Sequence, residues 1–342
     1  MQYTTLGRTG LRVSRTSFGV LPLQRVPMAE AVRLLRKAHE HEINFFDTAR
    51  AYTDSEEKIG AALSAVRDEV IIATKSGGQD AAEVRAHLET SLRNLRTDYV
   101  DLLQLHNPVS LCGEDDPRYQ ELRAAQASGK TRFIGITCHR LNVALEGVAS
   151  GLYDTVQFPL SAISSDEDLR LIADCRQRNI GLIAMKALCG GLLTNIPAAF
   201  AFLRQYEQVV PIWGIQRECE LDELLALEDA PPALDEAMLE VIARDRRELA
   251  TDFCRACGYC LPCPEEIPIP MAARMSLLLR RMPYQQFLSE NWQQQMLAIE
   301  NCRHCGQCTA RCPYQLDTPR ILVKMLEEYR KFLATADSEA PP

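Results

Sequence analysis

Eight of the thirteen cysteines in the chain fall in two short runs near its C-terminus, and both runs end in Cys-Pro. The first run, CRACGYCLPCP, begins at Cys254, and the second, CRHCGQCTARCP, begins at Cys302. Thiolate sulfurs bind zinc and iron–sulfur clusters, whereas disulfides are rare in a reducing cytoplasm. The two runs therefore predict metal–thiolate centres rather than a disulfide framework.

The spacing of the second run, C-x₂-C-x₂-C-x₃-C-P, is typical of cysteines that bind [4Fe–4S] clusters. The first run is one residue shorter before its last cysteine. In proteins with two such clusters, the fourth cysteine of each run binds the cluster of the other run. Zinc is the competing interpretation, because C-x₂-C pairs also build tetrahedral zinc sites, but two triplets that each lead to Cys-Pro favour iron–sulfur. The predicted ligand sets are Cys254, Cys257, Cys260 with Cys312, and Cys302, Cys305, Cys308 with Cys263.

Four other reactive side chains lie in the first third of the chain, near the ends of short apolar runs. Asp47 ends INFFD, Lys75 follows VIIAT, His106 follows DLLQL, and Tyr52 comes five residues after Asp47. Any one of these residues alone would more often be an ordinary polar loop residue than a catalytic one. Three ionisable groups at the ends of three successive runs favour a shared function, provided that the runs are strands whose ends meet.

These four side chains suit the delivery of a proton to an oxygen atom. A tyrosine hydroxyl ordinarily has a pKa of about 10 and is a poor acid at neutral pH. Lys75 beside Tyr52 would stabilise the phenolate, and Asp47 would keep the lysine charged and oriented. His106 can donate a hydrogen bond to a substrate carbonyl. The set therefore predicts protonation of a carbonyl oxygen as a hydride arrives at its carbon.

Short apolar runs that alternate with amphipathic segments form the frame for these residues. We expect strands at residues 13–19, 43–47, 70–74, 101–105, 131–136, 154–158, 180–185 and 209–213, with helical patterns between them. Eight strands that alternate with helices predict an α/β (β/α)₈ TIM barrel, in which reactive groups gather at the C-terminal strand ends. An open doubly wound sheet is the alternative, but no G-x-G-x-x-G follows the first strand. Residues 1–13 are expected to form a hairpin that turns at Arg8-Thr9-Gly10.

The strand pattern stops after Trp213, and helical patterns continue to the last residues. We expect a barrel at residues 1–240, a small, mostly helical iron–sulfur domain at 241–334, and a flexible tail at 335–342. A net charge of −8 without a long basic stripe argues against nucleic acid as a partner. No run reaches about 18 apolar residues, and the N-terminus lacks an apolar signal core. We therefore expect a cytoplasmic protein with no membrane segment.

The segments FFDTARAY, IATKSG, LLQLH, GKTRFIGIT and GLIAMKALCGGLLT resemble the aldo/keto reductase family over about residues 3–225. The resemblance implies Tyr52 as the general acid, with Asp47, Lys75 and His106 completing a catalytic tetrad. It also implies NADPH or NADH as the hydride donor and a small carbonyl or alcohol as the substrate. The cofactor-binding residues that it implies are Thr137, Gln157, Met185, Lys186, Gly191 and Arg217.

By this resemblance, Gln157 and Thr137 would contact the nicotinamide carboxamide. The loop from Lys186 to Gly191 would cover the pyrophosphate, and Arg217 would meet the adenosine end. The chain departs from the family where Cys138 replaces a usual asparagine and Met185 replaces a usual aromatic residue. The segment WGIQRECELDEL lacks the residues with which the family usually binds the 2′-phosphate of NADPH. The sequence therefore favours NADPH over NADH only slightly.

The helices around the cysteine runs resemble a helical ferredoxin domain, so the whole chain is similar to the iron–sulfur branch of the aldo/keto reductases. The resemblance implies two [4Fe–4S] clusters for electron transfer and a redox protein as a possible partner. One alternative is an electron-transfer or redox-sensing protein whose barrel binds nucleotide but turns over little. Another is a Schiff-base lyase that uses Lys75. A hydride carries two electrons and a cluster one, and the sequence shows no flavin-binding signature to bridge them.

Overall fold

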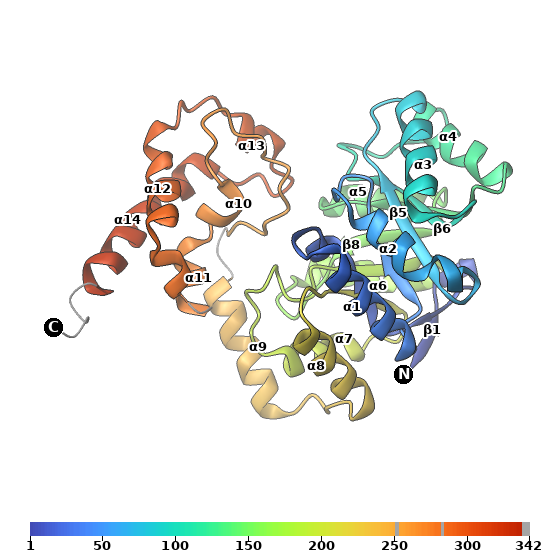
Figure 1. Ribbon diagram of the computed structural model, residues 1–342, viewed down its shortest axis with the longest axis horizontal. Coiled ribbons are helices and arrows are strands. Elements are labelled where there is room, and N and C mark those ends of the chain that lie inside the picture. Colours follow the sequence, from blue (N-terminus) through green and yellow to red (C-terminus); the bar gives the residue numbers. More distant parts are fainter. Residues whose placement is uncertain (250–252, 282–283, 337–342) are drawn as a thin grey trace. The chain divides into compact units, whose positions relative to one another are not determined.

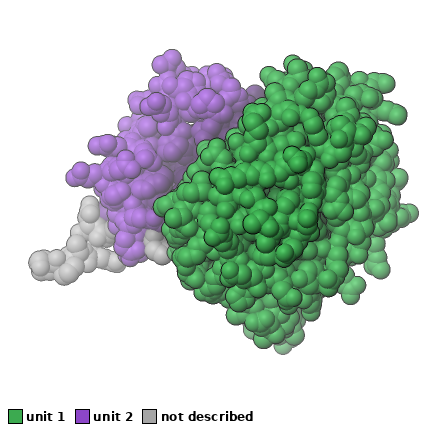
Figure 2. Space-filling view, turned by 45° about the vertical axis from the view of Figure 1, so that its right-hand side comes forward, with its two compact units in different colours: residues 1–187, 197–242 green, residues 188–196, 243–342 purple. Residues whose placement is uncertain are grey.

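The structure is a computed structural model that describes residues 1–249, 253–281 and 284–336 (Figure 1). The chain divides into two compact units, one of residues 1–187 and 197–242 and the other of residues 188–196 and 243–342 (Figure 2). The sequence-based boundary placed residues 188–196 in the barrel, whereas their contacts group this loop with the second unit. The predicted tail lies outside the described residues from residue 337 onward.

In the part of the chain that the structure describes, eight parallel strands close into a barrel. Their order is β10-β3-β4-β5-β6-β7-β8-β9, so sequential strands are neighbours and the last strand pairs with the first. The predicted (β/α)₈ barrel is confirmed. The strands are β3 (Ser17–Gly19), β4 (Phe45–Asp47), β5 (Ile71–Ser76), β6 (Val100–His106), β7 (Thr131–Thr137), β8 (Thr155–Pro159), β9 (Gly181–Met185) and β10 (Val209–Gly214).

Amphipathic helices follow the strands and cover the outside of the barrel (Figure 1). Local signals fix where several of them begin. Asp80 accepts a hydrogen bond from Glu83 N at the start of α3, and Ser165 forms a capping box with Asp168 at the start of α6. The helices are α1 (Met28–Glu40), α2 (Ser55–Leu63), α3 (Ala81–Leu95), α4 (Pro117–Ala127), α5 (Leu141–Ser150), α6 (Asp166–Gln177), α7 (Ile196–Arg204) and α8 (Glu218–Asp229).

The predicted N-terminal hairpin is confirmed, and it contributes to the core of the barrel. Strands β1 (Tyr3–Thr5) and β2 (Arg12–Ser14) pair antiparallel around a 3₁₀ turn at Gly7–Thr9. Val13 was expected in the first barrel strand but belongs to β2, where it pairs with Thr4. Its buried side chain joins an apolar cluster of Leu6, Leu11, Val13, Phe45, Ile71, Ala73, Leu102, Ile183, Met185, Val210 and Ile212.

The second unit is helical, as predicted for the C-terminal domain (Figure 1). Its long last helix, α14 (Thr318–Ala336), packs against α10 (Ile269–Ala272), α11 (Met275–Arg281) and α13 (Gln307–Arg311). Buried side chains of Met275, Leu278, Leu322 and Tyr329 form part of its core. The connecting helix α9 (Glu236–Leu249) precedes the first cysteine run, and α12 (Glu290–Leu297) precedes the second.

Candidate active site and iron–sulfur sites

A buried ion pair lies at the C-terminal ends of β4 and β5. Lys75 Nζ is 2.5 Å from Asp47 Oδ1 and donates a second hydrogen bond to Thr48 O at 2.6 Å. Lys75 is 1% exposed and Asp47 2%. Burial lowers the pKa of Lys75 and raises the pKa of Asp47, and in each case the charge of the partner opposes the shift. The charge of each partner therefore offsets part of the effect of burial on the other.

The rings of Tyr52 and His106 lie beside this pair. Their centroids are 5.7 Å apart with an interplanar angle of 82°, and Lys75 Nζ is 5.5 Å from the Tyr52 ring centroid. Both residues remain partly accessible. Desolvation by the surrounding protein, together with the Lys75 charge, lowers the pKa of the His106 imidazole to about 3. The structure therefore brings together all four predicted catalytic residues, with His106 as a neutral ring.

The loop that carries Tyr52 is fixed by a side chain that the sequence analysis did not identify. Glu56, which is 1% exposed, forms an ion pair with Arg50 and accepts a hydrogen bond from Thr74 Oγ1 at 2.7 Å. Arg50 N also donates to Lys75 O at 3.0 Å. These contacts tie the β4–α2 loop to β5. They hold Tyr52 at the barrel mouth near Lys75.

Three buried polar side chains extend from Asp47 across the barrel interior. Gln157 Nε2 donates to Asp47 Oδ1 at 3.3 Å, and Gln104 Nε2 donates to Gln157 Oε1 at 2.9 Å. Thr137 Oγ1 donates to Gln104 Oε1 at 3.0 Å. The predicted cofactor residues Gln157 and Thr137 thus join the Asp47 network, and the residue between them, Gln104, was missed. A glutamine inside the apolar run DLLQL was the signal that could have identified it.

The other predicted cofactor residues do not share one hydrogen-bonded network, and each lies in a different environment. Met185, at the end of β9, is 7% exposed and belongs to the apolar core cluster. Lys186 and Gly191 both have left-handed backbone, with φ of 60° and 90°. Arg217 precedes α8, and its guanidinium forms an ion pair with Glu220 at 2.7 Å. The structure therefore does not bring Arg217 into the Asp47 network.

One glycine of the loop after β9, Gly191, has an open backbone. A Cβ atom on Gly191 would meet no atom within 4 Å, so the backbone faces free space there. Within the second unit, Arg274 Nη1 donates to Gly190 O at 3.1 Å and Arg274 Nε donates to Pro270 O at 2.9 Å. The Arg274 side chain thus anchors residues 188–196.

Four cysteines from both runs surround one cavity of the second unit. Cys254, Cys257 and Cys260 come from the first run, and Cys312 comes from the second. We call this space the first cavity. Arg255, Tyr314, Thr318 and several apolar residues complete its lining, and Arg255 lies over the Tyr314 ring at 4.5 Å. Burial and neighbouring thiols raise the pKa of the Cys260 thiol to about 12.

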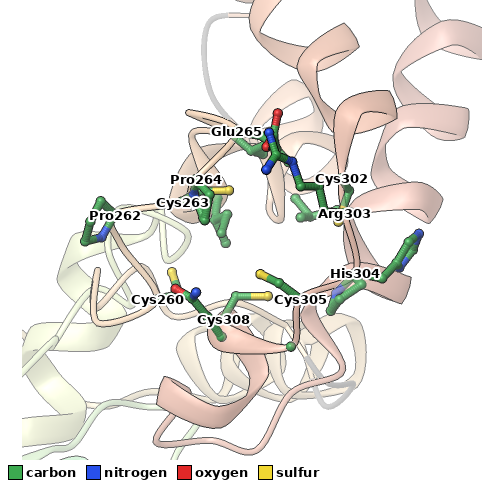
Figure 3. Close-up of a pocket in the computed structure, with 16 residues that line it drawn as sticks. Cys260, Pro262, Cys263, Pro264, Glu265, Cys302, Arg303, His304, Cys305 and Cys308 are labelled. Atoms are coloured by element: carbon green, nitrogen blue, oxygen red, sulfur yellow. The ribbon is translucent and has the colours of Figure 1, made fainter.

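A second cavity is lined by Cys302, Cys305 and Cys308 of the second run and by Cys263 of the first. The sulfur atoms of Cys263, Cys305 and Cys308 point into the same space in Figure 3. Cys260 also lines this cavity, so the two cavities share a wall. Seven of the eight cysteines each line only the cavity of their predicted ligand set, and Cys260 lines both cavities.

The two cysteine runs repeat one backbone conformation. Ala256 and His304, each just before the second cysteine, have φ of 51° and 53°. Gly258 and Gly306, each just after that cysteine, have φ of 85° and 73°. Such left-handed residues turn successive N–H groups towards one concave space, which binds anions and iron–sulfur clusters. Ala256 N donates to Cys254 Sγ at 3.4 Å, which is one contact of this kind.

Among the described residues, no three Cys, His, Asp or Glu side chains converge closely enough to hold one metal ion. The preference for iron–sulfur clusters over zinc rests instead on the spacing of the two cysteine runs.

Comparisons with known proteins agree with this architecture. The model of the aldo/keto reductase family matches residues 16–229, and that of a 4Fe-4S dicluster domain matches residues 253–317. L-galactose dehydrogenase of Arabidopsis thaliana is 36% identical over 219 residues, which cover 57% of this chain and 68% of that protein. The uncharacterized oxidoreductase YrpG of Bacillus subtilis is 29% identical over 223 residues, which cover 56% and 68%.

Solved structures show the same barrel. A Pseudomonas aeruginosa protein assigned as an aldo-keto reductase aligns with a TM-score of 0.59 and 26% identity over 66% of this chain and 93% of its own. The aldo-keto reductase AKR11C1 of Bacillus halodurans aligns with a TM-score of 0.63 and 20% identity over 72% and 96%, and supports the fold alone.

The chain belongs to the aldo/keto reductase family. It is an oxidoreductase that carries a 4Fe-4S dicluster domain after its barrel. None of the helices in the described residues is long and apolar enough to cross a membrane.

Proposed function

We propose that the protein is an NAD(P)H-dependent oxidoreductase that interconverts a small carbonyl compound and an alcohol, and that it holds two [4Fe–4S] clusters. The observation that carries the proposal is the contact of Lys75 with Asp47 at 2.5 Å beside the Tyr52 and His106 rings. A charged lysine next to a tyrosine hydroxyl is an arrangement for proton donation.

The chain's own residues supply the proton and orient the carbonyl. The nicotinamide, when bound, supplies the hydride. Tyr52 donates its hydroxyl proton to the carbonyl oxygen, and Lys75 stabilises the phenolate that remains. Asp47 keeps Lys75 charged in a site from which water is largely excluded. The reverse reaction uses the same groups, with the phenolate taking the proton of the alcohol.

His106 is assigned the role of a hydrogen-bond donor. Because the pKa of its imidazole is lowered to about 3, the ring is neutral at physiological pH and carries one N–H. A neutral donor positions the carbonyl oxygen without competing with Tyr52 as the acid. This separation of roles supports Tyr52 as the group that transfers the proton.

The proposed nucleotide site uses residues at the same strand ends. Gln157 and Thr137 would hold the nicotinamide carboxamide, and the Lys186–Gly191 loop would present backbone N–H groups to the pyrophosphate. The pairing of Arg217 with Glu220 leaves this arginine less free to select a 2′-phosphate, so the proposal covers NADPH and NADH alike. Because one relative is an L-galactose dehydrogenase, sugar aldehydes and sugar alcohols belong among the substrates to be tested.

The second unit is proposed to hold one [4Fe–4S] cluster in each cavity, with the two crossed cysteine sets as ligands. The dicluster match and the shared wall of the cavities support two neighbouring clusters. Such clusters exchange single electrons.

The exposed Cys305 beside the second cavity makes this side the proposed contact point for a redox partner. Thiolate-bound clusters also suit a reducing cytoplasm. We assign residues 1–240 to hydride chemistry and residues 241–334 to the clusters.

The proposal is tested by comparing the wild type with Tyr52→Phe, using NADPH and NADH and a panel of aldehydes, ketones and sugars. Tyr52→Phe should lower turnover about 100-fold or more, because it removes the transferable proton, and should leave nucleotide affinity nearly unchanged. Lys75→Met should also be severe. Tyr206→Phe, which changes a partly exposed tyrosine outside the site, is the matched control. Full activity of Tyr52→Phe would refute the assignment, and nucleotide binding without turnover of any substrate would favour an electron-transfer protein.

A further inference from the structure

Gln104 occupies a central position in the polar layer of the barrel. It lies two residues before His106 on β6, is fully buried, and is paired in register with Lys75 on β5. On its other side it pairs with Gly135 on β7. A Cβ atom at position 135 would come within 3.1 Å of Gln104 Cγ, so the glycine leaves the space that the glutamine side chain occupies.

The chemistry of Asp47 fixes how the Gln104 amide is oriented. An ionised carboxylate only accepts hydrogen bonds, so the amide nitrogens of Gln104 and Gln157 must face Asp47. Gln104 Nε2 is 3.5 Å from Asp47 Oδ2 and 2.9 Å from Gln157 Oε1. Its Oε1 atom is then left to accept the hydroxyl proton of Thr137 at 3.0 Å.

This orientation sets the hydrogen-bonding direction of both residues assigned to the nicotinamide. Thr137 uses its single hydroxyl proton on Gln104, so it presents only lone pairs to a ligand. Gln157 has its oxygen engaged by Gln104 and one N–H directed to Asp47, so it retains an N–H to offer. A carboxamide, which has N–H donors and a carbonyl acceptor, complements this pair.

We propose that Gln104 is a positioning residue for the hydride reaction. Its amide aligns the Asp47 carboxylate that holds Lys75, and it fixes Thr137 as an acceptor and Gln157 as a donor for the nicotinamide carboxamide. The proton-donating group and the cofactor seat are therefore aligned by one side chain. This inference rests on the proposed function and adds a residue to which neither the tetrad nor the nucleotide assignment gives a role.

The test compares two probes with and without the nicotinamide ring. The dissociation constant of NADPH or NADH, whichever binds more tightly, is measured together with that of the matching ADP-ribose fragment. Gln104→Leu should weaken binding of the dinucleotide about tenfold, the equivalent of losing about one hydrogen bond of 1.4 kcal/mol. It should leave the affinity of the ADP-ribose fragment unchanged. Leu102→Val, in the apolar layer of the same strand, is the matched control and should alter neither affinity.

The pH dependence of turnover gives a second readout that a purely structural role would not change. In Gln104→Glu, an ionised carboxylate faces Asp47 of β4, with Lys75 of β5 as the neighbouring cation, and repulsion between the two carboxylates should impair the site. Once protonated, the new carboxyl group at position 104 has an O–H donor and a carbonyl acceptor, like the amide that it replaces. Turnover of this variant, relative to the wild type, should therefore rise as the pH falls.

The outcomes separate this inference from the function on which it rests. Wild-type protein that binds neither dinucleotide nor fragment would refute both. Wild-type protein that binds both, with a Gln104→Leu variant that also binds both with wild-type affinity, would overturn the role of Gln104 alone. An equal loss of affinity for both probes would equally overturn it, because that result indicates general loosening of the barrel. Selective loss of dinucleotide affinity supports it.

Discussion

The Asp47–Lys75 pair is a costly arrangement of two residues, and we propose that it serves the hydride reaction. Removing two charges from water costs several kcal/mol for each ion, and the attraction between them often only balances that cost. A pair that is at most 2% exposed is therefore a weak source of stability. In the proposed mechanism its value lies in a cation held at a fixed position beside the Tyr52 ring, 5.5 Å from the ring centroid.

His106 leads to a prediction about acid sensitivity. Its pKa is about 3 in the folded protein, against about 6.5 in an unfolded chain. As the pH falls below about 6.5, the unfolded chain binds a proton that the folded protein does not, so the free energy of unfolding decreases. In His106→Gln this contribution is absent. The free energy of unfolding should therefore fall by up to about 2 kcal/mol less between pH 7 and pH 5 than it does in the wild type.

The measurement is urea unfolding at several pH values, followed by tryptophan fluorescence in a Trp292→Phe background. Trp213, which is buried in the barrel, then reports on this unit. His41→Gln, at an exposed position, is the control for the loss of a histidine outside the site. An unchanged slope in His106→Gln would show that the imidazole is not held neutral.

Three of the four catalytic candidates could be predicted from the sequence because each stands at the end of an apolar run. Asp47, Lys75 and His106 are polar residues where a buried strand gives way to a loop, and the barrel brings such ends together. Gln104 and Glu56 were missed for a physical reason. The apolar neighbours of Gln104 in DLLQL indicate its burial, but only the folded structure shows its hydrogen-bond partners. Glu56 lies within a helix, so only the folded structure shows that it is buried and hydrogen-bonded.

At the scale of elements, the two cysteine runs act as a repeated unit whose last cysteine crosses to the other site. The shared left-handed residues at Ala256 and His304, and again at Gly258 and Gly306, explain why the runs fold alike. The crossed sets have a consequence for paired substitutions. Two cysteines of one set should affect the same cluster even when they come from different runs.

Iron content should reveal this crossing. We predict about eight irons per chain in protein prepared without oxygen, as two [4Fe–4S] clusters require, and about four in Cys254→Ser. Adding Cys312→Ser should leave about four, whereas adding Cys302→Ser should remove nearly all of the iron. Cys219→Ser, which changes an exposed cysteine of α8, should keep the wild-type content. Two zinc ions per chain with negligible iron would refute the cluster assignment.

The loop at residues 188–196 gives a second prediction at this scale. Arg274, which is 4% exposed, donates to Gly190 O and Pro270 O. Arg274→Met leaves both carbonyls without this donor, which should loosen the loop at a cost of about 1–3 kcal/mol. If Gly191 contributes to pyrophosphate binding, the dissociation constant of NADPH should rise several-fold.

Limited proteolysis and nucleotide titration measure the two effects of Arg274→Met. Cleavage within residues 188–196 should become faster. Arg280→Met, which changes an exposed arginine on α11, is the control for general effects on the unit. Faster cleavage with an unchanged NADPH affinity would exclude this loop from the nucleotide site.

The order of the elements could be predicted because their periodicity is strong, but some boundaries depend on tertiary pairing. All eight barrel strands were located from apolar runs. The run at residues 13–19 was divided between β2 and β3, because Val13 pairs with Thr4 in the hairpin and Ser17 pairs with Ile212 in the barrel. The grouping of residues 188–196 with the second unit depends on Arg274, which lies about 80 residues further along the chain, and no local pattern could reveal that contact.

At the scale of the whole molecule, the chain joins two kinds of redox chemistry. The proposed barrel reaction moves two electrons as a hydride, whereas each proposed cluster exchanges one electron. The sequence shows no flavin-binding signature that would convert one into the other. We therefore expect hydride transfer in the barrel to proceed without electron exchange with the clusters.

One anaerobic titration tests this claim most directly. Flavin-free protein with its iron retained is treated first with NADPH and then with dithionite, while visible absorbance and the spin-resonance signal of reduced clusters are recorded. We predict that NADPH leaves the clusters oxidised, or reduces them much more slowly than it reduces an aldehyde substrate, and that dithionite then bleaches them at once. Rapid bleaching by NADPH alone would contradict the account and make the barrel a direct source of electrons for the clusters.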